Sequence, residues 1–325
     1  AIAEEVGIIT ENHRTHIIDG KEFDRMSDAD FQKRVSKIDV YARVTPEQKL
    51  RIVEGWQKYG DVLAMTGDGV NDAPALRRAD IGIALGSGTD LAKEASDIVL
   101  INNSFSGIVT AIKEGRIIFE NIRKIVVFLL FDAFTETALV SFSVIFGLPL
   151  PLLPAQILWI NLVEDSLPNT ALAFESGDGA VMKEKPSSFR KLFDARSFLL
   201  TFLFGSITIA SIIAFFLLFY FAGRNIDYIR TIIFVILGID SLFYIFSIRN
   251  FHKPFWTISL KDNPHMAVAV AVGLMALMSA VYVPFLQTFL RTVPLSFFDW
   301  LIIIGYGLGS LLVAEILKFF LFHRR

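Results

Sequence analysis

Two aspartates and an asparagine lie close together in residues 66–76, which read Thr-Gly-Asp-Gly-Val-Asn-Asp-Ala-Pro-Ala-Leu. The carboxylates of Asp68 and Asp72 are hard oxygen ligands of the kind that Mg²⁺ prefers. The amide of Asn71 is a neutral donor suited to a phosphoryl oxygen. The glycines of the segment allow the backbone to turn sharply and to approach a ligand closely. The pattern therefore indicates magnesium-assisted phosphoryl chemistry.

The segments on either side of this loop predict how it is positioned. An apolar run at residues 62–65 is typical of a buried parallel strand, and Pro74 suits the first turn of a helix, which does not need its missing N–H. The loop would then leave the carboxyl end of a strand, where open α/β sheets bind ligands. Around it we expect helices at 46–59, 73–79 and 90–95 and strands at 62–65, 81–85 and 98–101. This alternation predicts a partial, doubly wound parallel sheet.

Composition separates the chain into two parts. The 325 residues are 53% hydrophobic with a mean hydropathy of +0.53, which is too apolar for one ordinary soluble domain. Most charged residues precede position 125, so we expect a soluble module at 1–115 and a membrane module at 116–325. The net charge of −2 does not favour a nucleic-acid partner. The absence of cysteine excludes disulfides and thiolate metal sites.

The second part contains long apolar stretches, each able to cross a hydrocarbon core of about 30 Å. We expect a bundle of six transmembrane helices, at residues 125–146, 153–174, 198–221, 229–248, 266–287 and 300–322. Basic loops at 175–196 and after 248, together with Arg324 and Arg325, alternate with poorly charged loops. The positive-inside rule therefore predicts a multi-pass protein in a lipid bilayer with both ends of this chain cytoplasmic. The helix that starts near Ser106 is expected to continue into the first span.

Several carboxylates lie inside the predicted spans, where charge is costly and marks a functional site. Helical spacing puts Asp132 and Glu136 on one face of the first span. Asn161, Glu164 and Asp165 share one face of the second span. Carboxylate and amide oxygens together form a site suited to Ca²⁺.

Pro168 follows this second group and offers no N–H to the carbonyl of Glu164, so the helix is expected to loosen around residues 164–167. Irregular backbone inside a membrane is tolerated where it lines a cavity. Asp240, in the fourth span, is a further candidate for cation binding. Glu315 lies one turn before Lys318 and is expected to form a structural ion pair with it.

The loop at 66–76 resembles the hinge motif of P-type ATPases, the pumps that move cations through a phospho-aspartate intermediate. Other segments resemble the same family in the same order along the chain, and the last of them is similar to the ion-binding sixth membrane helix of the calcium-pump branch. These segments are residues 20–24, 43–49, 81–89, 93–97 and 161–168.

The resemblance implies a haloacid-dehalogenase-like phosphorylation domain, here partial, followed by the last six of ten membrane helices. It implies catalytic roles for the hinge loop and for the lysine of residues 43–49, with ATP as substrate and Mg²⁺ held by Asp68. Asp72 would hold the loop, and Lys49 and Asn71 would contact the phosphoryl group. The implied catalytic residues are Lys49, Thr66, Gly67, Asp68, Asn71 and Asp72.

The resemblance also implies ligands for the transported cation. Glu136, Asn161 and Asp165 match calcium-pump ligands, whereas Glu164 stands where that pump has a threonine and Ala133 where it has an asparagine. One Ca²⁺ per cycle is therefore expected. Asp132 and Asp240 are additional candidates.

The family's phosphorylated aspartate lies in an Asp-Lys-Thr-Gly-Thr run that does not occur in this sequence. We therefore expect the C-terminal portion of a pump, inactive alone, whose N-terminal half supplies this aspartate and the nucleotide-binding domain. The expected activity is export of Ca²⁺ from the cytosol, across the plasma membrane. The alternatives are Na⁺, K⁺, Mn²⁺ or H⁺ as the ion, a non-pumping membrane scaffold derived from half of a pump, and a membrane-tethered phosphatase.

Overall fold

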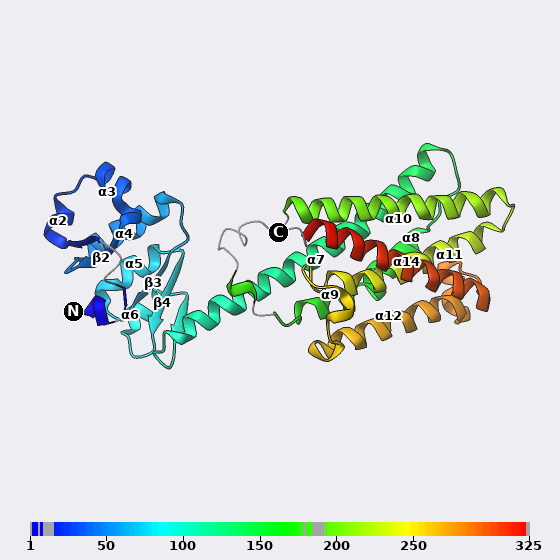
Figure 1. Ribbon diagram of the computed structural model, residues 1–325. Helices are drawn as coiled ribbons and strands as arrows, with labels where there is room; N and C mark the ends of the chain where they lie inside the picture. Colours follow the sequence, from blue (N-terminus) through cyan, green and yellow to red (C-terminus); the bar gives the residue numbers. More distant parts are fainter. Residues whose placement is uncertain are drawn as a thin grey trace. The chain divides into compact units, whose positions relative to one another are not determined.

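The computed structural model describes residues 2–5, 7–8, 16–177, 180–183, 192 and 194–322. The chain divides into two compact units, Ala1–Ile112 and Lys113–Arg325, which Figure 1 draws with the helices and strands labelled. The C-terminal arginines and most of the basic loop near residues 184–191 lie outside the described residues.

The first unit alternates short strands with helices. Its strands are β1 (His16–Asp19), β2 (Ile38–Ala42), β3 (Ala64–Gly67), β4 (Ile81–Leu85) and β5 (Ile98–Leu100). Its helices are α1 (Ile2–Glu5), α2 (Gly20–Asp24), α3 (Asp28–Arg34), α4 (Pro46–Tyr59), α5 (Ala73–Arg78) and α6 (Asp90–Glu94), with 3₁₀ turns η1 (Val35–Lys37) and η2 (Val70–Asp72). The predicted alternation of helix and strand is confirmed.

All strand pairs in this unit are parallel, as predicted, but the strands described form two sheets and not one. β1 pairs with β2, and β4 lies between β3 and β5. β3 also begins two residues later than the apolar run suggested. Val62 is 70% exposed, and the N–H of Leu63 donates to Asp80 at 2.9 Å, so these residues form a loop that leads into the strand.

Helix α4 has the predicted bounds because both of its ends carry strong local signals. Thr45 caps the first turn, Gln48 returns the hydrogen bond to the Thr45 N–H, and Pro46 occupies a position that needs no donor. Gly60 ends the helix in the left-handed conformation, at φ 100°. Gln48 also donates to the carbonyl of Gly20 at 2.9 Å and so ties α4 to α2.

The second unit consists almost entirely of helices. These are α7 (Ser106–Ile145), whose first residues belong to the first unit, α8 (Pro154–Trp159), α9 (Ser166–Ala173), α10 (Ala195–Phe221), α11 (Ile226–Ile248), α12 (Pro264–Tyr282), α13 (Pro284–Leu290) and α14 (Phe297–Phe322). A π-turn, η3 (Ile160–Glu164), joins α8 to α9, and 3₁₀ turns lie at η4 (Ala180–Met182), η6 (Phe255–Thr257) and η7 (Leu260–Asp262). α7 is a single helix of 40 residues, as predicted.

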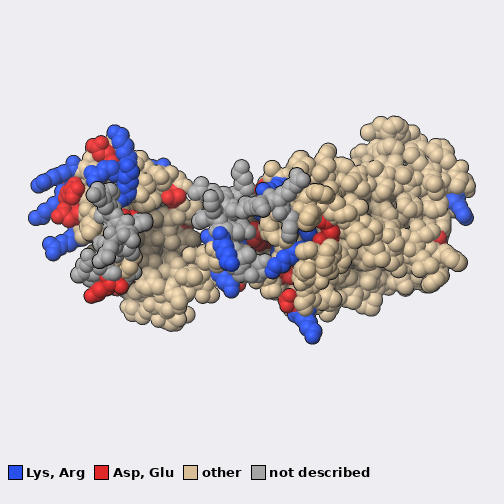
Figure 2. Space-filling view, in the orientation of Figure 1, with Lys and Arg blue, Asp and Glu red and all other residues tan. Residues whose placement is uncertain are grey.

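Among the described residues, five helices are long and apolar enough to cross a membrane: α7, α10, α11, α12 and α14. The chain is therefore an integral membrane protein. On the face shown in Figure 2, the middle of the helical unit carries almost no charged side chains, and those visible gather toward its ends. α11 is the central helix of the unit, because it is buried on nearly all sides.

Two of the six predicted spans differ from the structure. The segment 153–174 is not one helix but two short ones separated by the π-turn. The segment 266–287 is also interrupted, because α12 ends at Tyr282 and a new helix begins at Pro284. Proline disfavours helical conformation in the residue before it, which explains the second break at Val283.

A buried ion pair holds the ends of several of these helices together. Arg249, after α11, donates two hydrogen bonds to the carboxylate of Glu175 at 2.8 and 2.9 Å, and the two side chains are 2% and 5% exposed. Asn263, which caps α12, donates to the same carboxylate and to the carbonyl of Ala171 in α9. Asn121 of α7 donates to the backbone carbonyl of Glu175. These bonds satisfy charges that would be costly to bury alone.

Candidate functional site

Asp72 is the centre of the loop that follows β3. The ammonium of Lys49, on α4, lies 2.5 Å from one carboxylate oxygen of Asp72. The other oxygen accepts the backbone N–H groups of Asp68 at 3.3 Å and of Gly69 at 3.2 Å. Asp72 therefore holds residues 68–72 in a tight turn. Both of its carboxylate oxygens accept hydrogen bonds from the protein in doing so.

Within the same loop, the backbone of Gly67 lies directly against the side chain of Asp72. A Cβ atom placed on Gly67 would lie 2.5 Å from the Cβ of Asp72, so only glycine fits there. The carbonyl of Asp68 accepts the N–H of Thr89, the residue that caps α6, at 2.9 Å. The loop is thus fixed by its own carboxylate on one side and by the start of α6 on the other.

Asp68 and Asn71 project from this loop. Both are exposed, and within the described residues the carboxylate of Asp68 has no hydrogen-bond or ion-pair partner. Thr66 is half-buried at the end of β3. An exposed, unpaired carboxylate beside an amide fits a hard cation such as Mg²⁺, which retains several waters and binds through one or two carboxylates. Of the two aspartates of the loop, Asp68 is therefore the one whose carboxylate is available to such a cation.

The electrostatics of Asp72 agree with its internal role. Burial opposes ionisation of this carboxyl group, but the hydrogen bond from Lys49 and those from the backbone amides of Gly69 and Asp68 outweigh it and hold its pKa below its ordinary value. Asp72 is therefore a charged acceptor at neutral pH, and its oxygens are occupied by the protein.

In the helical unit, Glu136 of α7 and Asn161 of the π-turn are brought into direct contact. The side-chain amide of Asn161 donates to both carboxylate oxygens of Glu136, at 3.1 and 3.0 Å, and to the carbonyl of Ile157 at 3.0 Å. Glu136 is buried, with 9% of its surface exposed. An amide group and a carboxylate from two different segments are thus in direct contact.

Asp165 lies at the end of the π-turn, in electrostatic range of Glu136. Its N–H bonds to the carbonyl of Ile160, five residues back, at 2.9 Å, which is the wider spacing of a π-turn. Asp165 is 1% exposed, and one carboxylate oxygen accepts the hydroxyl of Ser241 at 2.5 Å. The other oxygen is buried without a hydrogen bond in the described part of the chain. Ser241 was not among the predicted site residues, although its position beside Asp240 in an apolar helix was a usable signal.

The remaining predicted ligands are placed differently. Asp132 is buried one turn before Glu136 on α7. The backbone of Glu164 belongs to the π-turn, but its side chain lies outside the described residues. Asp240 is directed to α10 and α14, beside Thr208 and Ser310. Within the described residues, no three His, Cys, Asp or Glu side chains come together at metal-binding spacing.

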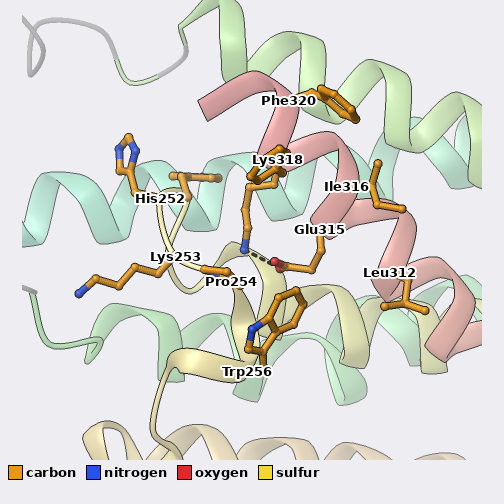
Figure 3. Close-up of a pocket in the computed structure, with 11 residues that line it drawn as sticks. His252, Lys253, Pro254, Trp256, Leu312, Glu315, Ile316, Lys318 and Phe320 are labelled. Atoms are coloured by element: carbon orange, nitrogen blue, oxygen red, sulfur yellow. Dashed lines mark hydrogen bonds and ion pairs between the residues drawn. The ribbon is translucent and has the colours of Figure 1, made fainter. Parts of the chain in front are cut away.

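The expected pair of Glu315 and Lys318 is confirmed on α14. The ammonium of Lys318 lies 2.5 Å from the carboxylate of Glu315 and donates to the carbonyl of Ser247 at 2.7 Å. The hydroxyl of Ser247 donates to the same carboxylate. Figure 3 shows this pair at the side of a pocket of about 340 Å³, with Leu312 and Ile316 on the same helix. The pair is buried and satisfied, which is consistent with a structural role.

The chain thus joins a parallel α/β unit with a carboxylate loop to membrane helices that contain buried carboxylates. Comparison with known proteins agrees. Residues 149–320 match the family described as cation transporting ATPase, C-terminus, and residues 51–112 match haloacid dehalogenase-like hydrolases.

Individual relatives extend this match over nearly the whole chain. A calcium-transporting ATPase of Bacillus subtilis is 39% identical over 311 residues, which cover 94% of this chain and 34% of the relative. Calcium-transporting ATPase 1 of Saccharomyces cerevisiae is 36% identical, over 98% of this chain and 34% of the relative. The human calcium-transporting ATPase type 2C member 1 is 35% identical, over 98% and 35%. The chain belongs to the P-type cation-transporting ATPases, as a C-terminal portion similar to calcium pumps. It spans about a third of the length of these relatives.

Proposed function

We propose that this chain supplies the cation site and part of the phosphoryl-handling site of an ATP-driven pump that exports Ca²⁺ from the cytosol. The observation that carries the proposal is the contact of Glu136 with Asn161 at a π-turn, with Asp165 in electrostatic range of Glu136. Carboxylate, amide and backbone oxygens are the ligands that Ca²⁺ takes. The names of the relatives support the same ion.

The loop after β3 supports the part of the proposal that concerns phosphoryl transfer. Mg²⁺ bound to Asp68 would neutralise charge on the phosphoryl group that is transferred from ATP. Asn71 and Lys49 are proposed to contact that group. Asp72, held between Lys49 and the loop amides, fixes the position of Asp68 and so orients it. Thr66 and Gly67 form the end of β3 that carries the loop.

The phosphorylated aspartate and the nucleotide-binding domain are proposed to come from an N-terminal half that this sequence does not contain. We further propose that the protein lies in the plasma membrane and that this chain crosses the bilayer six times. The second crossing is formed by α8, η3 and α9 together. Both ends of this chain are proposed to be cytoplasmic. One Ca²⁺ per cycle is expected, because Ala133 and Glu164 replace an amide and a hydroxyl residue of related calcium pumps.

The test is formation of an acid-stable phosphoenzyme from labelled ATP while free Ca²⁺ is titrated. It is made on this chain alone and on this chain supplemented with an N-terminal half from a calcium-transporting relative. Calcium-dependent labelling is expected only with both halves, and Asp165→Asn should abolish its calcium dependence, whereas Asp262→Asn, an exposed control, should not. Labelling that depends on Mn²⁺, Na⁺ or K⁺ but not on Ca²⁺ would contradict the proposal that Ca²⁺ is the transported ion. Absence of labelling with both halves would favour a non-pumping role.

A further inference from the structure

The pocket drawn in Figure 3 is separate from the two sites described above and has two unlike ends. It lies between the exposed side of α14 and the connection that follows α11, and its volume of about 340 Å³ is within the range of small-ligand sites. Figure 3 shows the basic side chains of His252 and Lys253 at one end and the apolar side chains of Leu312 and Ile316 at the other. This division suits an amphipathic ligand with a charged head group and an apolar tail.

The apolar end of the pocket is formed by one face of α14. The apolar side chains of this face recur at helical spacing and are 55–57% exposed: Leu312, Ile316, Phe319 and Phe320. Between Leu312 and its last residue, Phe322, the helix rises about 15 Å. That distance is roughly one leaflet of a hydrocarbon core of about 30 Å, so the pocket has the depth that one acyl chain of a lipid occupies.

The floor of the pocket presents no unpaired charge to a ligand. Glu315 and Lys318 border the pocket but form a buried ion pair with each other. Ser247 adds one hydrogen bond to each of them, through its hydroxyl and its carbonyl. An acyl chain can therefore cover this pair without burying an uncompensated charge. The positive charge that a ligand meets is at the rim.

The rim is held in a fixed conformation. The side chain of Asn250 accepts the backbone N–H groups of His252 and Lys253 at 2.8 and 3.0 Å. Phe251, which precedes them, is 4% exposed and stacks on Phe322 of α14 with the ring centres 5.2 Å apart. The side chains of His252 and Lys253 are themselves exposed. The connection thus presents an ammonium group and a ring N–H donor from an ordered backbone, which lowers the cost of binding.

Trp256 indicates that this rim lies at the surface of the bilayer. Its side chain lines the same pocket and is 64% exposed. Tryptophan is enriched where the hydrocarbon core meets the lipid head groups. In the proposed topology this is the cytoplasmic surface, whose lipids are partly anionic. Lys253 would therefore meet phosphate groups of opposite charge beside an apolar wall of α14.

We propose that this pocket binds one anionic glycerophospholipid of the cytoplasmic leaflet, with its phosphate at Lys253 and His252 and one acyl chain along Leu312 and Ile316. Basic pockets between membrane helices on the cytoplasmic side suit such head groups. A zwitterionic lipid offers the same tails but no net charge, so the positive rim favours the anionic lipid. The inference goes beyond the proposed pump, and it rests on the proposed orientation of this chain in the membrane, not on transport.

The test is thermal unfolding of the purified chain in a neutral detergent, without ATP or Ca²⁺, while lipid is titrated at constant ionic strength. The lipids are dioleoylphosphatidylglycerol, which is anionic, and dioleoylphosphatidylcholine, which has the same tails and no net charge. A ligand that binds only the folded state raises the melting temperature. We expect a rise of about 3 °C with phosphatidylglycerol and a much smaller one with phosphatidylcholine. Equal rises with the two lipids would overturn the proposal.

Sodium oleate distinguishes a phospholipid from a fatty acid. It has one acyl chain and an anionic head group but no phosphate and no glycerol. We expect weaker stabilisation by oleate than by phosphatidylglycerol, because a phosphate accepts hydrogen bonds from Lys253 and His252 together. Stabilisation by oleate that equals or exceeds that by phosphatidylglycerol would overturn the assignment to a phospholipid.

A charge variant tests the rim. Lys253→Gln removes the ammonium group and should weaken the apparent affinity for phosphatidylglycerol about fivefold, which is the effect of one basic residue near an anionic membrane surface. Lys261→Gln makes the same change at an exposed lysine of the same connection that does not line the pocket, and it is the matched control. Equal affinities of the two variants would contradict the proposed position of the phosphate.

A second variant keeps the charge and fills the apolar end. Ile316→Trp should weaken the binding of phosphatidylglycerol about tenfold, as expected when roughly two methylene groups of the acyl chain lose their contacts. Leu308→Trp is the matched control, since Leu308 is 51% exposed on the same face of α14 and does not line the pocket. Both positions are exposed, so neither change disturbs a buried contact. An affinity unchanged by Ile316→Trp would also overturn the proposal.

Discussion

Two aspartates of the loop after β3, Asp68 and Asp72, have opposite environments although they are only four positions apart. Asp72 is buried and accepts hydrogen bonds from Lys49 and from two backbone amides. Asp68 is exposed, and its carboxylate has no partner within the described residues. The first is therefore built to hold the loop, and the second is available to a metal ion. Sequence analysis assigned these roles from a family resemblance, and the geometry gives a physical reason for the difference.

Replacing Lys49 tests the role of Asp72. Lys49→Met leaves the Asp72 carboxylate partly buried without its cation and should weaken the loop by about 1–2 kcal/mol. Hydrogen exchange at the amides of Asp68 and Gly69, which bond to Asp72, should accelerate about tenfold. Lys58→Met, an exposed position on the same helix, is the control and should leave this exchange unchanged.

The lowered pKa of Asp72 also predicts a pH dependence. A carboxyl group whose pKa is lower in the folded state stabilises the protein above its unfolded pKa of about 3.9, and this stabilisation is lost as pH falls through the folded value. Exchange at the Asp68 and Gly69 amides, corrected for its intrinsic pH dependence, should therefore stay slow down to about pH 4. Protection that was lost near pH 6 would contradict the assignment.

Ser241 is expected to tune the proposed calcium site although it is not a ligand. Its hydroxyl orients the carboxylate of Asp165, so Ser241→Ala should weaken calcium binding about threefold to tenfold through loss of one charge-assisted hydrogen bond. The measurement is the Ca²⁺ concentration for half-maximal phosphoenzyme formation in the assembled pump. An unchanged value, equal to that of the control Ser279→Ala, whose hydroxyl bonds only to its own helix, would show that Ser241 does not position Asp165.

At the scale of elements, the segment 154–173 is built from two short helices joined by a π-turn. Pro168 predicts a break from sequence alone, because it offers no N–H to the carbonyl of Glu164. The structure has the irregular turn at Ile160–Glu164, slightly before the predicted residues. Its position depends on packing against α12 and α7, which sequence periodicity does not report.

Replacing Pro168 by a residue with a backbone N–H should make this turn more like a regular α-helix. Pro168→Ala would supply an N–H to the Glu164 carbonyl, favour a regular helix and so turn Asp165 away from Ser241. Calcium affinity in phosphoenzyme formation should fall by about tenfold or more. Pro284→Ala is the matched control, since this proline begins α13, where no donor is needed; equal effects of the two substitutions would contradict the prediction.

At the scale of the whole molecule, local signals predicted elements better than they predicted their pairing. α4 has its predicted bounds because Thr45, Pro46 and Gly60 mark its ends within a few residues. The division into two sheets was not predicted, because strand pairing depends on contacts distant in sequence. Asp165 and Ser241 are 76 residues apart, and no spacing rule connects them.

The proposed topology can be tested on this chain directly because it contains no cysteine. Single cysteines at Gly223 and Arg291 should react with a membrane-impermeant thiol reagent added from outside cells. A cysteine at position 261, in place of Lys261, should react only after the membrane is permeabilised. The unmodified chain gives no background, and outside labelling at position 261 would reverse the assigned orientation.

The π-turn has a consequence for how this segment tolerates insertions and deletions. It contains one residue more than an α-helical turn, so everything after it is rotated by about 100° relative to a regular helix. Making this turn regular without removing a residue would therefore turn Asp165 away from Ser241, whereas deleting one residue between positions 160 and 164 would give a regular helix and leave the direction of Asp165 unchanged. In this segment the extra residue and the π-turn compensate for each other, and the direction of the carboxylate depends on both.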